Sequence, residues 1–146
     1  MSEFPMIREC MATDLITLSP DAEIIHAMMT LLDGRISGAP VVDERDQLVG
    51  VLSKKDCLKA ALNASYFQEW GGAVAEYMNE NVETLDANLD VVQAAEAFLA
   101  SPYRRFPVLD DGVLVGQVSL NNRHIANLCG QFSRSVFGAV VMDNYA

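Results

Sequence analysis

The amino-acid sequence predicts an α/β fold of two β-α-β-β-α repeats that pack with pseudo-two-fold symmetry, with small mixed sheets flanked by helices. Three observations lead to this prediction: an internal repeat, the same order of elements in each copy, and a suitable length. The segment Glu9–Leu62 recurs in degraded form at Glu76–Leu128. Matching pairs at an offset of 67 positions are Met11 and Met78, Thr17 and Thr84, and Pro40 and Pro107.

One residue is missing from a polar turn of the second copy, and the offset is 66 from there on. Leu48-Val-Gly50 then matches Leu114-Val-Gly116, and Ser53 matches Ser119. A single gap in a turn is where length changes are tolerated. Because a chain of 146 residues gives each half only a marginal core, we expect the halves to press together and to leave equivalent clefts between them.

The first copy predicts its elements in a clear order. Asp21 precedes an apolar-periodic segment, and aspartate favours the N-cap of a helix. Ile24, Met28, Leu31 and Leu32 then fall on one helical face. Two short apolar runs bounded by the acidic turn Asp43–Asp46 indicate consecutive strands. The predicted elements are a short helix at Ile7–Met11, an extended segment at Leu15–Leu18, strands at Ala39–Val42 and Leu48–Leu52, and a helix at Lys54–Leu62.

The second copy repeats this order. Asn88 takes the cap position, and Val91, Ala95, Phe98 and Leu99 form the helical face. Strands are predicted at Arg105–Leu109 and Val113–Val118, followed by a helix at Leu120–Leu128. The expected division is a first repeat at 7–63, a connector at 64–73 anchored by Tyr66, Phe67 and Trp70, a second repeat at 74–130, and a tail at 131–146 whose apolar run Ala139–Met142 docks on this chain or a partner.

Composition narrows the classes of function. A net charge of −10 repels polyanions, which makes nucleic acid an unexpected partner. No apolar run approaches the roughly 20 residues that span a bilayer, and the N-terminal segment lacks the pattern of a signal peptide. We therefore expect a cytoplasmic protein with no membrane partner. Three widely spaced cysteines disfavour a disulfide framework and a zinc site.

Two copies of this element order resemble a tandem pair of cystathionine-β-synthase (CBS) domains, the Bateman module, here in a stand-alone form. The resemblance covers about residues 7–129, and it rests on several motifs that occur in order in both copies. In the first copy these are Ile7-Arg-Glu-Cys-Met11, Ser37-Gly-Ala-Pro-Val-Val-Asp43 and Val49-Gly-Val-Leu-Ser-Lys-Lys-Asp56; in the second, Val74-Ala-Glu-Tyr-Met78, Arg105-Phe-Pro-Val-Leu-Asp110 and Val115-Gly-Gln-Val-Ser119.

The resemblance implies a regulatory module that senses an adenosine-containing ligand, such as AMP, ADP, ATP or S-adenosylmethionine, in a cleft between the repeats. Ser53 and Asp56 lie where a strand turns into a helix, and a carboxylate there can accept hydrogen bonds from the ribose hydroxyls. The competing interpretation is a plain helix N-cap. Further predicted contacts are Thr17 and the segment Ile36, Ser37, Gly38, Ala39 and Pro40, whose backbone can read the adenine edge.

The second copy departs from this pattern. Ser119 is retained, but Asn122 stands at the position of Asp56, so the second site is expected to bind ribose more weakly. Arg104 and Arg105 are candidates for phosphate contacts, against the alternative that they are solvated. The predicted second site comprises Arg104, Arg105, Phe106, Pro107, Ser119 and Asn122.

Chemistry beyond binding has little support in the sequence. His26 and His124 lack a nucleophile at a catalytic spacing, and Cys57 is expected to be a buried, inert thiol. We therefore predict no enzyme, no metal site and no required cofactor. Because paired modules of this kind associate through their helices, the resemblance implies a homodimer that acts on an unidentified regulated protein. The alternative function is a ligand-free dimerisation and interaction scaffold.

Overall fold

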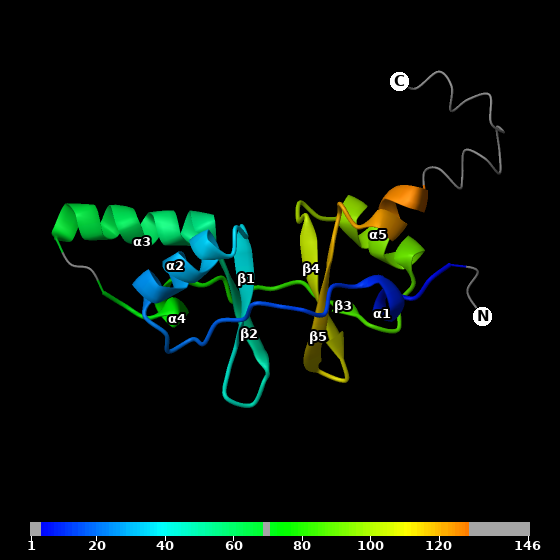
Figure 1. The fold of residues 1–146 in the computed structure, drawn as a ribbon, viewed down its shortest axis with the longest axis horizontal. Helices are drawn as coiled ribbons and strands as arrows, with labels where there is room; N and C mark the ends of the chain where they lie inside the picture. Colours follow the sequence, from blue (N-terminus) through cyan, green and yellow to red (C-terminus); the bar gives the residue numbers. More distant parts are fainter. Residues whose placement is uncertain (1–3, 69–70, 129–146) are drawn as a thin grey trace, which may run out of the picture. The chain divides into compact units, whose positions relative to one another are not determined.

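The chain forms small sheets covered by helices, as the sequence predicts, and it divides into two compact units (Figure 1). The computed structural model describes residues 4–68 and 71–128. Unit 1 contains Met1–Thr13, Thr84–Asp110 and Val115–Ala146, and unit 2 contains Asp14–Glu83 and Asp111–Leu114. The elements in chain order are α1 (Ile7–Cys10), α2 (Ile24–Asp33), β1 (Gly38–Val42), β2 (Leu48–Ser53), α3 (Lys54–Phe67), α4 (Val74–Tyr77), β3 (Leu85–Asp86), α5 (Val91–Leu99), β4 (Arg105–Asp110) and β5 (Val113–Ser119).

Unit 2 is built on the antiparallel hairpin β1–β2, and α2, α3 and α4 lie on one side of it (Figure 1). The register pairs Gly38 with Ser53 and Val41 with Gly50. The acidic turn closes on itself, because Asp43 Oδ1 accepts hydrogen bonds from two backbone amides at 2.9 and 3.0 Å. The extended segment predicted before α2 forms a single parallel bridge, Leu18 to Val41, and no longer strand. It therefore adds only one residue to the sheet.

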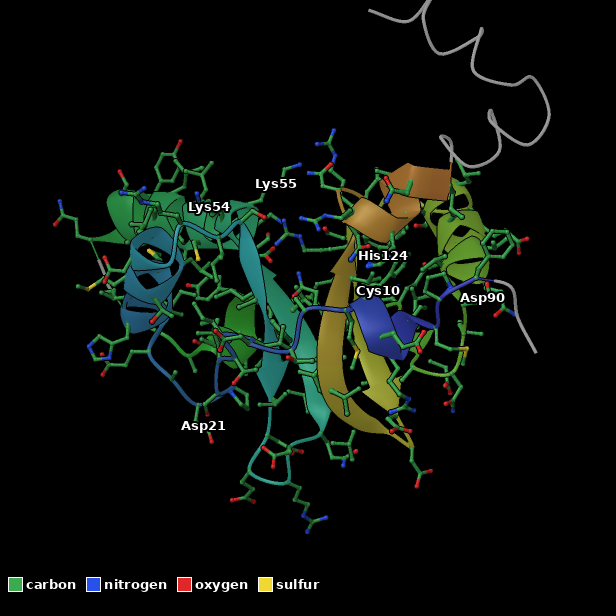
Figure 2. All side chains as sticks on the ribbon, turned by 45° about the vertical axis from the view of Figure 1, so that its right-hand side comes forward. Cys10, Asp21, Lys54, Lys55, Asp90 and His124 are labelled. Atoms are coloured by element: carbon green, nitrogen blue, oxygen red, sulfur yellow. The ribbon has the colours of Figure 1, made fainter. Side chains whose placement is uncertain are left out.

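The N-caps of the two long first helices lie two residues later than predicted. Helix α2 begins at Ile24 after Glu23, and Asp21 lies in the exposed turn before it (Figure 2). Helix α5 is capped by Asp90, whose side chain accepts from Gln93 N at 2.9 Å. Asn88 instead accepts a hydrogen bond from the Arg8 guanidinium. The cap predictions for Asp21 and Asn88 were wrong, because each of these residues lies in a tight turn that precedes the helix.

The apolar faces of α2 and α5 are narrower than predicted. Ile24, Leu31, Val91 and Phe98 are buried, but Leu32 is 64% exposed and Leu99 is 89% exposed. Ala27 and Ala94 take the inner positions instead. The core therefore accepts a small residue one turn into each helix, and the last leucine of each run points outward.

Unit 1 carries the three-stranded sheet in the order β3-β4-β5. Strands β3 and β4 are parallel, with Leu85 opposite Val108. Phe106 is 1% exposed and packs against Phe98 with ring centroids 4.8 Å apart. On the outside, the guanidinium of Arg8 forms an ion pair with Asp110 at 3.0 Å. Unit 1 is thus a small mixed sheet closed by α1 and α5.

The helix that ends each repeat has boundaries that differ from the prediction. Helix α3 continues five residues beyond Leu62 to Phe67, and Ala64 in this extension is buried. Tyr66 and Phe67 are 79% and 69% exposed, so these connector aromatics do not serve as anchors within the described chain. The final helix begins at Arg123, three residues later than predicted. Trp70 and the tail segment Ala139–Met142 lie outside the described residues.

The short leading helix of each repeat completes the core of the other repeat. Ile7 of α1 is fully buried in unit 1, and Val74 of α4 is fully buried in unit 2. Ile7 N donates to Leu89 O at 2.8 Å, and Val74 N donates to Ala22 O at 2.9 Å. Equivalent backbone bonds thus fix the two helices in equivalent places. Each compact unit therefore combines segments from both repeats.

Because the leading helix of each repeat packs in the core of the other, a methionine at its end lies against a glycine in each unit. Gly50 of β2 is in close contact with Met78, where an added Cβ would lie 2.7 Å from Met78 Sδ. Gly116 of β5 is in the same relation to Met11, at 2.5 Å. The Val-Gly step of each repeat therefore fits the methionine that ends the leading helix of the other.

Candidate functional site

The predicted ribose site lies at the start of α3, where Ser53 and Asp56 bind each other. Asp56 Oδ2 accepts hydrogen bonds from Ser53 N and from Ser53 Oγ, both at 2.9 Å. Asp56 N donates to Ser53 Oγ at 3.2 Å, which completes a capping box. The pair therefore caps α3, and a ribose contact at Asp56 stays a prediction. Both residues are half-buried, and Asp56 Oδ1 has no hydrogen-bond partner among the described residues.

The segment 36–40 is joined to this helix start. Lys54 N, in the first turn of α3, donates to Ser37 O at 2.8 Å, and Gly38 pairs with Ser53 across the hairpin (Figure 2 shows Lys54 and Lys55 at this end of α3). A Cβ at Gly38 would lie 3.0 Å from Leu52 O, so glycine permits the close approach of the two strands. The structure thus places Ser37 and Gly38 beside Ser53 and Asp56.

The remaining residues predicted for this site have other surroundings. Ala39 is 2% exposed and Pro40 is buried, with its carbonyl accepting from Leu18 N at 2.9 Å. Ile36 is half-buried against the core of unit 2. Thr17 lines a separate pocket of about 480 Å³, which is otherwise formed by residues 18–21 and 42–44. Neither Ser53 nor Asp56 lines that pocket.

Unit 1 contains a second pocket, of about 290 Å³, at the predicted second site. Three of the predicted residues line it, namely Arg105, Ser119 and Asn122. The other lining residues are Cys10, Met11, Ala12 and Gln117, which sequence reasoning did not single out. Cys10, Met11 and Ala12 belong to the first repeat, and the sequence offers no sign that they meet the second. Gln117 N and O bond Ala12 O and N, both at 2.9 Å, and fix this wall.

Both polar atoms of the Asn122 side-chain amide form hydrogen bonds at this pocket. Asn122 Nδ2 donates to Cys10 O at 2.9 Å, and Asn122 Oδ1 accepts from His124 N at 2.9 Å (Figure 2 shows Cys10 on α1 and His124 on the last helix). Asn122 therefore caps the last helix and ties α1 to it. Phe106 and Pro107 are buried in the core, and Arg104 is exposed and does not line the pocket.

The cysteines near the two sites are held as neutral thiols. Burial, and secondarily the charge of Asp56, raises the pKa of Cys57, which is 8% exposed. Burial, and secondarily Glu9, raises the pKa of Cys10 in the same way. A helix start that stabilised a thiolate would lower the pKa instead. These thiols are therefore poor nucleophiles at neutral pH.

The part of the chain that the structure describes has few other side chains suited to catalysis or metal binding. His26 lies 3.9 Å from Glu23 on an exposed helix face. Among the described residues no cluster of three histidine, cysteine, aspartate or glutamate side chains has the geometry to hold a metal ion. None of the described helices combines the length and apolar character needed to cross a bilayer.

Comparison with known proteins identifies the repeats. The family model of the CBS domain matches residues 7–63 and 74–122. A sequence relative, the uncharacterised protein MJ1225 of Methanocaldococcus jannaschii, is 28% identical over 113 residues, which cover 77% of this chain and 39% of the relative. The inosine-5'-monophosphate dehydrogenase of the same organism is 30% identical over 115 residues, which cover 78% of this chain. The chain spans only 22% of that dehydrogenase.

Solved structures agree with the sequence comparison. CBSX2 in complex with AMP superposes with a TM-score of 0.72 at 25% identity, covering 89% of this chain and 99% of the other. The CBS domain pair of protein MJ0100, in complex with 5-methylthioadenosine and S-adenosyl-L-methionine, superposes with a TM-score of 0.70 at 26% identity. That match covers 88% of this chain and 98% of the other. The likeness therefore extends over nearly the whole length of both structures.

Proposed function

The chain belongs to the CBS domain family, and from this premise we propose that it is a regulatory module that binds an adenosine-containing ligand. One observation carries the proposal. Two CBS pairs that match nearly the full chain at 25% and 26% identity are complexes, one with AMP and one with 5-methylthioadenosine and S-adenosyl-L-methionine. The regulatory ligand of this chain is accordingly AMP, ADP, ATP or S-adenosylmethionine.

Local geometry supports Ser53 and Asp56 as the ribose contacts. The capping box uses only one carboxylate oxygen of Asp56, and Oδ1 is left without a partner among the described residues. A ribose diol presents two hydroxyl donors, for which a carboxylate is a strong acceptor. The cap also holds the side chain in place before the ligand arrives, so little ordering entropy is lost on binding. The helix can therefore keep its cap while the ligand is bound.

The adenine contacts in this proposal come from the segment 36–40. Its backbone lies beside the start of α3, because Ser37 O accepts from Lys54 N at 2.8 Å. Gly38 has no side chain to block an aromatic ring, and the half-buried Ile36 supplies an apolar surface. Thr17 is an additional polar contact in the proposal. Ligand binding then acts by population shift, favouring one arrangement of the chain over others.

A charge-only substitution tests this site. In Asp56→Asn the amide oxygen can replace Oδ2 and keep both bonds to Ser53, but the negative charge is lost. A charged hydrogen bond contributes about 1.5–3 kcal/mol against about 1 for a neutral one, so affinity is expected to fall by about two- to thirty-fold. Calorimetric titration of wild type and variant with AMP, ATP, adenosine and S-adenosylmethionine measures this.

The matched control is Glu76→Gln. Glu76 is the third residue of α4 and its Oε2 accepts from Ala73 N at 2.8 Å, which is the role that Asp56 has in α3. This control also removes one carboxylate that accepts a hydrogen bond from the N-cap backbone of a unit 2 helix, and because Glu76 is not a predicted ligand contact, the affinity should stay unchanged. If both variants lose the same amount of ligand affinity, or if neither loses any, Asp56 is not a ligand contact.

Thermal melting tests the function itself. A ligand at 100 times its Kd adds about 2.7 kcal/mol to the free energy of unfolding. If no adenosine ligand raises the melting temperature of the wild-type protein, the chain is the ligand-free scaffold instead. We propose only a regulatory role for this chain, with no catalytic step. The proposed location is the cytoplasm, where adenine nucleotides are abundant.

A homodimer is part of the proposal, and one feature of α3 favours it. Leu58, Leu62 and Tyr66 follow each other at intervals of four residues, and they are 59%, 51% and 79% exposed. With the adjacent Phe67, they form an apolar stripe on the outside of unit 2. A stripe of large apolar side chains in water is typical of an association surface. The partner in this proposal is a second copy of the chain, and the dimer in turn acts on a regulated protein.

A further inference from the structure

The pocket of unit 2 that lies at the turn before α2 is acidic and contains no cation of the protein. Its volume is about 480 Å³, and Asp21, Asp43 and Glu44 line it, whereas no basic residue does. Asp43 uses Oδ1 to close its own turn, and its Oδ2 has no partner among the described residues. Within the same residues, the side chains of Asp21 and Glu44 form no hydrogen bond or ion pair. A cation in this pocket would relieve the repulsion between these charges.

The turn before α2 has an equivalent in unit 1. At an offset of 67 positions, Asp21 corresponds to Asn88 and Ser19 corresponds to Asp86 (Figure 2 labels Asp21). Asp21 N donates to Ser19 Oγ at 3.3 Å, and Asn88 N donates to Asp86 Oδ1 at 2.8 Å. The two turns therefore have the same internal hydrogen bond, and they place Asp21 and Asn88 at equivalent points.

In unit 1 a guanidinium occupies the corresponding place. Arg8 Nη1 donates to Asp110 Oδ2, and Arg8 Nη2 donates to Asn88 Oδ1, both at 3.0 Å. Asp110 corresponds to Asp43 at the same offset of 67 positions. The two acceptor positions are thus spaced for the two terminal nitrogens of one guanidinium.

Unit 2 has the acceptors but lacks the guanidinium. The residue that corresponds to Arg8 is Ala75. Arg8 N donates to Ala87 O at 3.3 Å, and Ala75 N donates to Pro20 O, its equivalent, at 2.9 Å. The two leading helices therefore bring these residues to equivalent points, but the side chain of Ala75 ends at Cβ. The acceptors of unit 2 are left for a group that the described chain does not supply.

We propose that this pocket of unit 2 binds a guanidinium group through Asp43 and Asp21, and that an arginine side chain of another protein supplies it. Asp21 offers a charged acceptor where Asn88 offers only an amide oxygen, and charged hydrogen bonds are the stronger ones. A bare metal ion needs ligands that converge on one point, whereas a guanidinium reaches two separate acceptors with a rigid fork. Neither Ser53 nor Asp56 lines the pocket, so guanidinium binding and adenosine binding can be lost independently.

Titration followed by nuclear magnetic resonance at constant ionic strength tests the proposal. The probes are Nα-acetyl-L-arginine N-methylamide, free arginine, and the uncharged Nα-acetyl-L-citrulline N-methylamide. In Asp43→Asn the amide oxygen can keep the turn bonds of Oδ1 while the charge is lost. We expect this variant to bind the arginine compound about three-fold or more weakly than the wild type.

The matched control is Asp46→Asn. Asp46 belongs to the same acidic turn, is exposed and does not line the pocket. Its φ of 59° lies in the left-handed region, which asparagine tolerates. This change removes the same charge from the same neighbourhood, so the affinity for the arginine compound should stay nearly that of the wild type.

A second pair of variants fills the pocket from within the chain. Ala75 is exposed, so Ala75→Arg can supply the guanidinium as Arg8 does in unit 1. We expect Ala75→Arg to block the arginine compound, whereas Ala75→Gln, a long side chain without charge, should leave binding intact. Ala75→Arg should also melt at a higher temperature than Ala75→Gln, and Asp43→Asn should remove that difference.

The results separate the possible occupants. Binding of the arginine compound that depends on Asp43 and is blocked by Ala75→Arg supports the proposal. Binding of free arginine without binding of the acetylated compound would overturn the protein side chain as the source. The proposal as a whole is overturned if the citrulline compound binds equally well, if Asp46→Asn weakens binding as much as Asp43→Asn, or if no arginine compound binds.

Discussion

At the scale of single residues, one serine has two different roles in the two repeats. Ser53 caps α3 directly, because its Oγ accepts a hydrogen bond from Asp56 N while its own backbone N donates to Asp56 Oδ2. Ser119 stands at the same place in the repeat, yet the helix after it starts only at Arg123, because Asn122 caps that helix. The cap at Ser53, which the sequence offered as the alternative to a ligand contact, is present, whereas the ligand contacts of Ser53 and Asp56 stay a prediction.

The glycines in the Val-Gly step of each repeat give a prediction at this scale. A Cβ at Gly116 would lie 2.5 Å from Met11 Sδ and 2.9 Å from Ala12 O, and a Cβ at Gly50 would lie 2.7 Å from Met78 Sδ. We expect Gly50→Ala and Gly116→Ala each to destabilise the protein by about 1–3 kcal/mol, because overpacking displaces neighbours. Thermal melts measure this.

Gly71→Ala serves as the control for these variants. An added Cβ at Gly71 meets nothing within 4 Å, so this change should leave the melting temperature nearly unaltered. If Gly50→Ala and Gly116→Ala melt like Gly71→Ala, the close contact between glycine and methionine does not constrain either unit.

At the scale of elements, local sequence patterns predicted the hairpin strands well. They did not predict which repeat each segment packs against. The hairpin strands were predicted within one residue, because short apolar runs and an acidic turn define them. Helix α3 was predicted too short, because its last turn exposes Tyr66 and Phe67 and contributes only the small Ala64 to the core. A repeat indicates which segments are alike, but it does not indicate which copy each segment packs against. The pocket wall formed by α1 was missed for this reason.

The exchange of α1 and α4 can be tested with fragments. A fragment of residues 1–72 lacks α4, which buries Val74 in unit 2, and a fragment of residues 73–146 lacks α1, which buries Ile7 in unit 1. Each fragment alone should show weak tertiary signals by near-ultraviolet circular dichroism, and an equimolar mixture should regain them. Fragments that fold alone as monomers with native melting temperatures would contradict the exchange.

At the scale of the whole molecule, the two compact units do not coincide with the two repeats. Family matches at 7–63 and 74–122 follow the sequence repeat, whereas unit 1 begins with the first thirteen residues of the chain. Because each unit borrows a helix, neither half of the sequence supplies a full core, consistent with the marginal size of a half domain. A change in one repeat can thus affect both units.

The proposed dimer gives a prediction at this scale. Leu62 and Tyr66 belong to the exposed stripe of α3, and their substitution leaves the buried face of the helix unchanged. Specific interfaces lose much of their affinity when a central apolar side chain is replaced by a charge that must be desolvated. We expect Leu62→Lys/Tyr66→Lys to shift the protein from dimer to monomer in light scattering coupled to gel filtration. Val113→Lys, a change at a 41% exposed apolar residue of β5, should leave the dimer intact. A wild-type protein that elutes as a monomer at all concentrations, or a dimer that survives both lysines, would rule out α3 as the interface.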